Sequence, residues 1–219
     1  MTLEPPPLLD PAPYPCQPSS SAEAHEAIAS ALSQRPHVVL DGAVASPLLR
    51  ALRQRVLSLP PPAFHPAGVG RKSDHGLQPH LRSDRIHWLD ARAPDEALWL
   101  EWANGLRQHL NRSLFLGLAD YEAHFAHYAP GQRYGRHLDA FRGQANRVLS
   151  TVLYLTEDWG EDDGGELLLE DGPEQRWRVS PQPGRLVVFL SEEVPHEVLS
   201  ARRDRYSIAG WFRVRGAVV

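Results

Sequence analysis

The second half of the chain alternates short apolar segments with turn residues, and this alternation constrains the fold more than any other feature. Pro130-Gly131 and the proline- and glycine-containing stretch 181–184 are typical of tight turns between strands. The predicted strands are 121–128, 134–137, 147–155, 165–169, 175–179, 185–190, 197–199 and 206–214. Eight strands in so short a stretch predict a compact sandwich or barrel of the jelly-roll type.

Helical patterns fill the first half of the chain, with short strands between them. One helix is predicted to begin at Ser46, because serine caps helices well and Pro47 suits the first helical position; the prolines at 60–62 stop it. In a later helix, predicted over 95–114, an apolar stripe recurs at helical spacing and is expected to face the core. It consists of Leu98, Trp102, Leu106 and Leu110. The other predicted helix is 22–35, and the predicted strands are 37–40 and 85–89.

These patterns predict a mainly β protein with flanking helices. Its core is expected to be a double-stranded β-helix, or jelly roll, of eight strands, with the N-terminal helices packed outside it. A single domain is predicted over residues 22–219, with helical support in 22–120 and the jelly roll in 121–219.

Two segments carry little regular pattern. Residues 1–21 hold seven prolines and a run of three serines, so we expect a disordered leader outside the fold. Residues 65–84 contain several glycines and charges without an apolar period. We expect a long loop there, and because long loops in compact domains are often functional, we interpret it as a lid over the substrate.

Composition excludes several classes of protein. The chain has 23 basic and 27 acidic residues, a formal net charge of −4, which argues against a general nucleic-acid binder. Its single cysteine, Cys16, cannot form an intramolecular disulfide. The first seven residues hold an acid and three prolines in place of the apolar run of a signal peptide, and no apolar stretch approaches the length of a membrane helix. We therefore expect a cytoplasmic protein that binds neither nucleic acid nor membranes.

His137 and Asp139 place an imidazole and a carboxylate two residues apart at the end of a predicted strand. Side chains at positions i and i+2 of a strand point to the same side, so both can face one interior point. Such a pair alone means little, because chance produces it often. His196 adds a second imidazole at the start of a later strand. Two histidines and one carboxylate form the facial triad of non-haem Fe(II) oxygenases, which leaves adjacent metal positions open for substrate and dioxygen.

Arg205 meets a further requirement of such a centre. If the open metal positions take a 2-oxoacid with a second carboxylate, a buried cation has to meet that carboxylate, and the planar fork of arginine suits it best. Arg205 stands nine residues after His196. We expect it on the next strand of the same hairpin, where an antiparallel return brings it beside the metal.

Two other histidines have a spacing that argues against a ligand role. His124 and His127 are three residues apart on a predicted strand, and an odd spacing sends them to opposite faces. We therefore expect both to be structural.

The residues named above lie in a series of motifs that resembles the Fe(II)- and 2-oxoglutarate-dependent prolyl 4-hydroxylases, most of all the hypoxia-sensing type and its bacterial relatives. The motifs are LRSDRIHW at 81–88, YAPG at 128–131, HLD at 137–139, RVLSTVLYL at 147–155, GGEL at 164–167 and HEVLSARRDRYSIAGWF at 196–212. They cover about two thirds of the chain, and their order and spacing are far more specific than any single motif. The short acidic turn at 161–163 and residues 1–21 depart from the family pattern.

The resemblance implies a role for each matching residue. His137, Asp139 and His196 would bind iron and form the catalytic centre. Arg205 would form a salt bridge with the distal carboxylate of 2-oxoglutarate, and Tyr154 would donate a hydrogen bond to the same group. The remaining matches are Tyr128, Val152 and Leu167 as walls of the cosubstrate pocket, Trp211 near the target residue, and Arg147 and Asp84 as links between the substrate-covering loop and the barrel.

The resemblance also implies a reaction and its participants. A prolyl residue of a protein would become 4-hydroxyproline. Fe(II) would be the bound metal, 2-oxoglutarate and O2 would be consumed to give succinate and CO2, and ascorbate would be a supporting reductant. For a chain similar to the bacterial members, the implied target is a translation factor such as elongation factor Tu, and we expect a monomer. Three alternatives stay open: the same chemistry on another side chain or a small molecule, a cupin-like metal enzyme without a 2-oxoacid, and a non-catalytic sensor of iron and 2-oxoglutarate.

Overall fold

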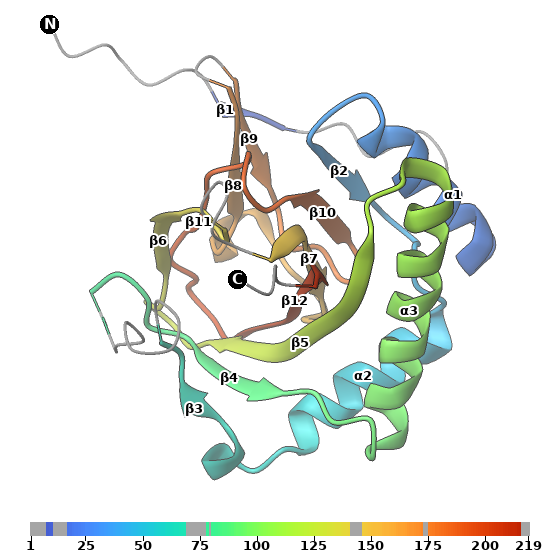
Figure 1. Ribbon diagram of the computed structural model, residues 1–219. Helices are drawn as coiled ribbons and strands as arrows, with labels where there is room; N and C mark the ends of the chain where they lie inside the picture. The colour runs from blue at the N-terminus through green and yellow to red at the C-terminus, as the bar shows by residue number, and fades with distance from the viewer. Residues whose placement is uncertain are drawn as a thin grey trace, which may run out of the picture.

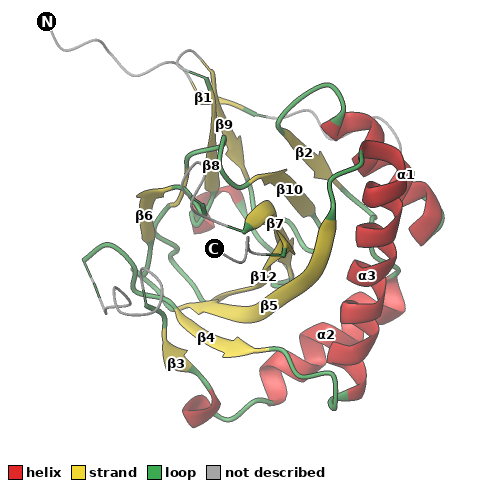
Figure 2. Cartoon of the chain, viewed as in Figure 1, coloured by secondary structure: helices red, strands yellow, loops and turns green. Residues whose placement is uncertain are grey.

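The chain forms two facing β-sheets, and helices cover the outer face of one of them (Figures 1 and 2). The computed structural model describes residues 8–10, 17–68, 78, 80–140, 146–172 and 175–215. Within this part of the chain no helix is long and apolar enough to cross a membrane. The α-helices are α1 (Ser21–Leu32), α2 (Ser46–Ser58) and α3 (Pro94–Leu114).

The sheets differ in size. The larger one has the strand order β2-β10-β7-β12-β5-β4-β3, and the smaller one has the order β1-β9-β8-β11-β6. The strands are β1 (Leu8–Leu9), β2 (His37–Leu40), β3 (His65–Pro66), β4 (Arg85–Trp88), β5 (Leu118–Tyr128), β6 (Tyr134–His137), β7 (Arg147–Tyr154), β8 (Leu167–Asp171), β9 (Gln175–Val179), β10 (Leu186–Leu190), β11 (His196–Val198) and β12 (Arg205–Val214).

The eight predicted core strands correspond to β5 through β12. Four of them (β5, β7, β10 and β12) lie in the larger sheet, and four (β6, β8, β9 and β11) lie in the smaller one. All pairings among them are antiparallel. The predicted jelly-roll core is therefore confirmed, and β2, β3 and β4 extend the larger sheet on its two edges.

Two apolar cores hold these layers together. One joins α1, α2 and α3 to the outer face of the larger sheet, and the other fills the space between the two sheets. The second core contains the aliphatic side chains of Val187, Leu169 and Val179, together with Tyr128 and Tyr154. Because a sheet with both faces covered is rigid and dry, side chains that project between the sheets are held in fixed positions.

The predicted apolar stripe on α3 is wrong at its first residue. Leu98 is 51% exposed, whereas Trp99 is fully buried and stacks on Trp102 with ring centroids 5.1 Å apart. The reason is helical geometry: a strict four-residue spacing drifts by roughly 40° per step on a helix of 3.6 residues per turn. The stripe that reaches the core therefore runs through Trp99, Leu106 and Leu110.

Three other local predictions need correction. Ser46 is the first helical residue of α2 and not its cap; Ala45 takes the cap position without a side-chain hydrogen bond, and Pro47 still falls within the first turn. The leader is not free of regular structure, because Leu8 and Leu9 pair in parallel with β9. The loop predicted over 65–84 begins with β3, whose residues pair with β4.

The predicted lid is only partly visible. Its central residues 69–77, together with residue 79, lie outside the described residues. Its two ends meet, since the amide of Ala67 donates to the carbonyl of Asp84 at 3.0 Å. The lid therefore stays a prediction for its central part.

His124 on β5 is a buried histidine with a strongly lowered pKa. It is 1% exposed, lies edge-on to Trp88 at a centroid distance of 5.1 Å, and contacts the carbonyl of Phe125 through Nδ1 at 3.3 Å. Burial lowers its pKa from 6.5 to about 3. The imidazole is therefore neutral at physiological pH.

This burial predicts an acid-sensitive stability. The unfolded chain protonates His124 near pH 6.5, but the folded chain does so only near pH 3, so the free energy of unfolding falls as the pH drops through this window. We expect His124→Leu to remove a slope of up to about 1.4 kcal/mol per pH unit from that fall, measured by urea denaturation between pH 6.5 and 4. An unchanged slope would contradict a buried, neutral His124.

The corrected stripe on α3 predicts a second difference in stability. Leu106→Ala should lower the free energy of unfolding by about 3 kcal/mol, because it leaves a cavity in a fully buried position. Leu98→Ala is the matched control on the same helix, and it should change the value by less than about 0.5 kcal/mol, because Leu98 is exposed. Urea denaturation at pH 7 measures both, and equal effects would show that the stripe is assigned wrongly.

Candidate metal and cosubstrate site

A pocket lies between the two sheets. Its walls come from both sheets: β6, β8 and β11 on one side, and β5, β7, β10 and β12 on the other. Every predicted site residue lines this pocket or contacts a residue that does, except for the lid. The members that line it directly are Tyr128, His137, Asp139, Val152, Leu167, His196, Arg205 and Trp211.

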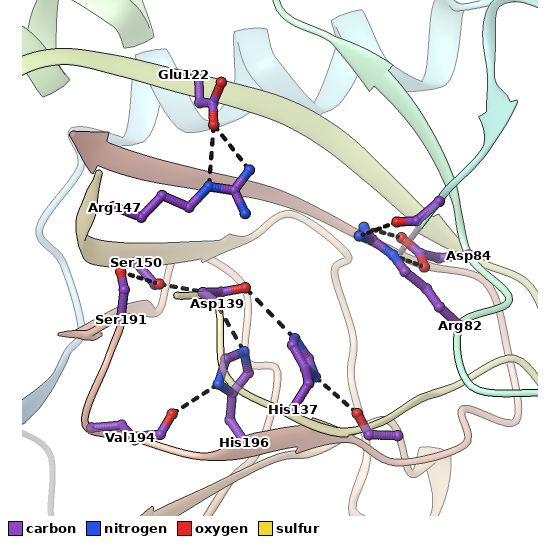
Figure 3. Close-up of polar contacts among 12 residues, drawn as sticks. Arg82, Asp84, Glu122, His137, Asp139, Arg147, Ser150, Ser191, Val194 and His196 are labelled. Atoms are coloured by element: carbon purple, nitrogen blue, oxygen red, sulfur yellow. Dashed lines mark hydrogen bonds and ion pairs between the residues drawn. The ribbon is translucent and has the colours of Figure 1, made fainter. Parts of the chain in front are cut away.

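His137, Asp139 and His196 meet at one point of the pocket. His137 ends β6, His196 begins β11, and the two residues lie directly opposite each other in the sheet. Asp139 follows β6 by two residues and places its Oδ1 3.6 Å from His137 Nε2 and its Oδ2 3.5 Å from His196 Nε2. Candidate ligand atoms of the three residues lie within 4.8 Å of one another (Figure 3). This spacing suits a single metal ion.

Backbone carbonyls orient both imidazoles. His137 Nδ1 lies 2.8 Å from the carbonyl oxygen of Gly135, and His196 Nδ1 lies 3.0 Å from that of Val194. Since a carbonyl only accepts, each Nδ1 donates to it, and Nε2 is the nitrogen of each ring that faces Asp139 and the pocket. Nε2 is therefore the atom that would bind a metal.

The charges of the cluster also suit a cation. Burial lowers the pKa of His196 to about 4, although Asp139 opposes this shift. Burial on its own raises the pKa of Asp139, but His196, His137 and the Ser150 hydroxyl together hold it well below its usual range. Near pH 7 the set is therefore a neutral His196 and an ionised Asp139, the donor chemistry that divalent iron binds.

Arg205 is a buried cation without an anion. It is 1% exposed, and among the described residues no carboxylate forms an ion pair with it; its Nη1 reaches only the Ser207 hydroxyl at 3.5 Å, and its Nε has no partner. Other arginines near the pocket differ, because Arg82 is paired with Asp84 and Arg147 with Glu122. A buried, uncompensated guanidinium is costly, so this geometry fits a ligand that brings its own carboxylate.

Tyr154 and Tyr128 complete this end of the pocket. The Arg205 guanidinium carbon lies 4.9 Å from the ring centroid of Tyr154 and 5.0 Å from that of Tyr128. The Tyr154 hydroxyl is buried and has no hydrogen-bond partner in the described part of the chain. Burial raises the pKa of both tyrosines, so each hydroxyl keeps its proton and can donate. The residues fit the distal carboxylate of 2-oxoglutarate.

Arg205 reaches the pocket by a different route from the one predicted. The expected hairpin between the strands of His196 and Arg205 does not form, because β11 lies in the smaller sheet and β12 in the larger. Arg205 instead pairs with Tyr128 at the end of β5 and projects across the space between the sheets. The two residues converge because the sheets face each other.

The remaining predicted site residues are Trp211, Arg147 and Asp84. Trp211 shares the parity of Arg205 on β12 and lines the pocket. Arg147 lies over the Trp211 ring at 3.7 Å and pairs with Glu122 at 2.9 Å. Asp84 is buried and binds Arg82 through two contacts of 2.8 and 3.1 Å.

Among the described residues Asp84 takes part in a link between the loop and the barrel, and the role expected of Arg147 stays a prediction. Arg82, held by Asp84, also donates to the carbonyl of Gly68 and lies over the ring of Tyr134 on β6. It thus joins one end of the predicted lid to the barrel, whereas the contacts of Arg147 described above lie on the larger sheet.

Sequence reasoning missed several residues of the pocket. His124 was expected to be structural, yet its buried side chain lines the pocket. Arg82, Tyr134 and Ser150 were not singled out, although Tyr134 stacks on His137 with ring centroids 3.5 Å apart. Strand parity could have found Ser150, which stands two residues before Val152 on the same face of β7.

Comparisons with known proteins agree with this geometry. The sequence model of the 2OG-Fe(II) oxygenase superfamily matches residues 123–213. A crystal structure of a Pseudomonas putida prolyl-4-hydroxylase is 39% identical, with a TM-score of 0.80, and the match covers 88% of this chain and 100% of that one. A Trichoplax adhaerens prolyl hydroxylase in complex with a peptide fragment of hypoxia inducible factor has a TM-score of 0.78 at 24% identity, over 88% of this chain and 90% of that one, which shows the fold alone.

A curated relative is similar over a shorter part of its length. The hypoxia-inducible factor prolyl hydroxylase of Caenorhabditis elegans is 31% identical over 145 residues, which is 60% of this chain. The matched region spans about a fifth of that relative, 20% of its length. Because the Pseudomonas putida protein is matched over its whole chain and the superfamily model covers the pocket-lining strands, this chain belongs to the 2-oxoglutarate- and Fe(II)-dependent oxygenase superfamily.

Proposed function

We propose that this protein is a prolyl hydroxylase, which uses Fe(II), 2-oxoglutarate and O2 to convert a prolyl residue of a protein into 4-hydroxyproline. The observation that carries the proposal is the His137, Asp139 and His196 cluster, which shares one pocket with the unpaired cation of Arg205. A metal site alone would fit many reactions. A metal site with a buried, anion-free arginine fits a cosubstrate that has a carboxylate at its far end.

In this proposal His137, Asp139 and His196 hold the iron. Fe(II) supplies the oxidative decarboxylation of 2-oxoglutarate by O2, which yields succinate, CO2 and the oxygen atom that enters the substrate. The protein contributes orientation. Since Nδ1 of each histidine is committed to a backbone carbonyl, neither ring can turn its Nε2 away from the metal position without losing a hydrogen bond.

Arg205 and Tyr154 bind the distal carboxylate of the cosubstrate. The guanidinium gains the anion that it lacks, and the Tyr154 hydroxyl gains an acceptor. Val152, Leu167 and Tyr128 form apolar walls between this carboxylate and the metal position. They exclude water, which strengthens the ion pair in a low-dielectric setting.

Trp211 and Arg147 form the substrate side. The Trp211 ring offers an apolar face suited to a proline ring, and its Nε1 is a buried donor without a partner in the described structure, able to bind a peptide carbonyl. Arg147 covers the ring and is itself held by Glu122. Further support comes from the similarity to the Pseudomonas putida prolyl-4-hydroxylase.

We take a translation factor, with elongation factor Tu as the first candidate, as the protein substrate to test. We also propose that the protein acts as a monomer in the cytoplasm and that ascorbate is its supporting reductant. The resemblance of the motifs to the bacterial prolyl hydroxylases supports the choice of candidate.

The role of Arg205 predicts a selective loss of cosubstrate affinity. Arg205→Ala should raise the KM for 2-oxoglutarate by on the order of 100-fold, because it removes one partner of a buried charge pair. Arg178→Ala on β9 is the matched control, since Arg178 is half exposed and pairs with Asp10 outside the pocket. Succinate formation at varied 2-oxoglutarate measures both. Unchanged turnover of Arg205→Ala at low 2-oxoglutarate would remove the cosubstrate assignment and favour a cupin-like enzyme.

The protein substrate is tested by mass spectrometry. We expect purified protein with Fe(II) and 2-oxoglutarate to add one oxygen atom to a specific proline, first in elongation factor Tu and then in a proteome from cells that lack this protein. Asp139→Ala is the control and should give no modification, because it removes the anionic iron ligand.

The same experiment separates the alternatives. Oxygen gained on another side chain would keep the oxygenase and discard the prolyl substrate. Turnover of 2-oxoglutarate with a metabolite but no protein would indicate a small-molecule oxygenase. Binding of 2-oxoglutarate without turnover under any substrate would indicate a sensor.

A further inference from the structure

Two buried serine hydroxyls lead from the larger sheet to the carboxylate of the candidate metal site (Figure 3). The Ser150 hydroxyl donates to Asp139 Oδ2 at 2.7 Å, and the Ser191 hydroxyl lies 2.9 Å from the Ser150 hydroxyl. Ser150 is 1% exposed and Ser191 is fully buried. Polar groups at this depth need partners, so the three residues depend on one another.

The donor and acceptor of each hydrogen bond in this series follow from the number of hydroxyl protons. A serine hydroxyl carries one proton, and that of Ser150 is committed to Asp139. In the contact between the two serines, Ser150 can therefore only accept, and Ser191 has to donate. The relay then runs one way, from Ser191 to Ser150 to Asp139, and each hydroxyl polarises the next.

The strands fix both serines. Ser150 on β7 pairs with Phe189 on β10, and Ser191 is the first residue after β10, so the two serines lie close together. The Ser191 amide also donates to the carbonyl of Val148 at 3.0 Å. Asp139, in contrast, lies beyond the end of β6. Its side chain therefore takes its orientation from the groups around it rather than from a strand ladder.

We propose that Ser150 is a positioning residue for the iron ligand Asp139 and that Ser191 holds Ser150 in its donating orientation. The Ser150 hydroxyl occupies a lone pair of Oδ2 and prevents the carboxylate from rotating. Asp139 would then present its other oxygen to a metal in a fixed direction, as supporting hydrogen bonds do for metal-binding carboxylates. This inference rests on the proposed metal site and adds to it Ser150 of the larger sheet and Ser191, the residue after β10.

A purely structural pair of hydroxyls would affect stability and not the metal. Thr151 provides the comparison, because it is the next residue on β7, is also buried beside the pocket, and bonds Tyr121 at 2.9 Å and the Gly210 carbonyl at 3.3 Å rather than Asp139. Thr151→Val removes those contacts without touching Asp139.

The test is Mn²⁺ binding to metal-free full-length protein, followed by the electron paramagnetic resonance signal of free Mn²⁺, with urea denaturation in parallel. Ser150→Ala should weaken the affinity about tenfold or more, as losses of such supporting groups do, and Ser150→Thr, which keeps the hydroxyl, should restore it. Ser191→Ala should weaken the affinity for Mn²⁺ about threefold, because the Ser150 hydroxyl still donates to Asp139 but is held less firmly. Thr151→Val should lower stability and leave the affinity unchanged.

The double variant gives the decisive comparison. Because Ser191 acts only through Ser150, Ser150→Ala with Ser191→Ala should bind Mn²⁺ like Ser150→Ala alone. Wild-type affinity in Ser150→Ala, or a Ser191→Ala loss of equal size in both backgrounds, would overturn the relay while leaving the metal site intact. Failure of the wild-type protein to bind Mn²⁺ would overturn the proposed metal site together with this inference.

Discussion

The buried charge of Arg205 is the constraint on which the pocket depends. A guanidinium shielded from water and without a carboxylate destabilises the fold, because its desolvation is not offset by an ion pair. A ligand that carries a carboxylate would supply that ion pair. The surrounding residues accept that charge without cancelling it: two tyrosine rings lie near it, and a serine hydroxyl makes one long contact. The pocket is therefore preorganised for an anion before any anion binds, which is how binding energy is saved for orientation.

The core between the helices and the larger sheet supports the fold, whereas the core between the two sheets surrounds the pocket. The helices and the larger sheet bury the aromatic side chains of α3 and form a rigid base. The smaller sheet carries His137 and His196 on β6 and β11, strands of only four and three residues. Short strands hold few ladder hydrogen bonds, so the base has to supply the precision that they lack. The base provides Arg205, the apolar wall at Val152 and the hydroxyl that binds Asp139.

Much of the architecture could be predicted from the sequence, for reasons visible in particular residues. Strand alternation placed the eight core strands, and the parity of β12 placed Arg205 and Trp211 on one face. The error at Leu98 arose because spacing by four resembles helical periodicity over short distances only. The false hairpin between β11 and β12 arose because sequence proximity favours pairing, whereas the chain crosses between sheets at this point. Partners such as Glu122 for Arg147 depend on three-dimensional packing, which no local pattern reports.

His137 and His196 of the proposed iron site lie on the smaller sheet and Arg205 lies on the larger one, and this placement has a mechanical consequence. A cosubstrate that reaches from the metal position to the Arg205 guanidinium would bind both sheets at once. One end would be held by β6 and β11 of the smaller sheet and the other by β12 of the larger one. The two sheets cannot then spread apart without releasing it. In the proposed function, binding of the cosubstrate would therefore be linked to the separation of the two sheets, and slower exchange of the interior amide hydrogens is expected in the bound protein.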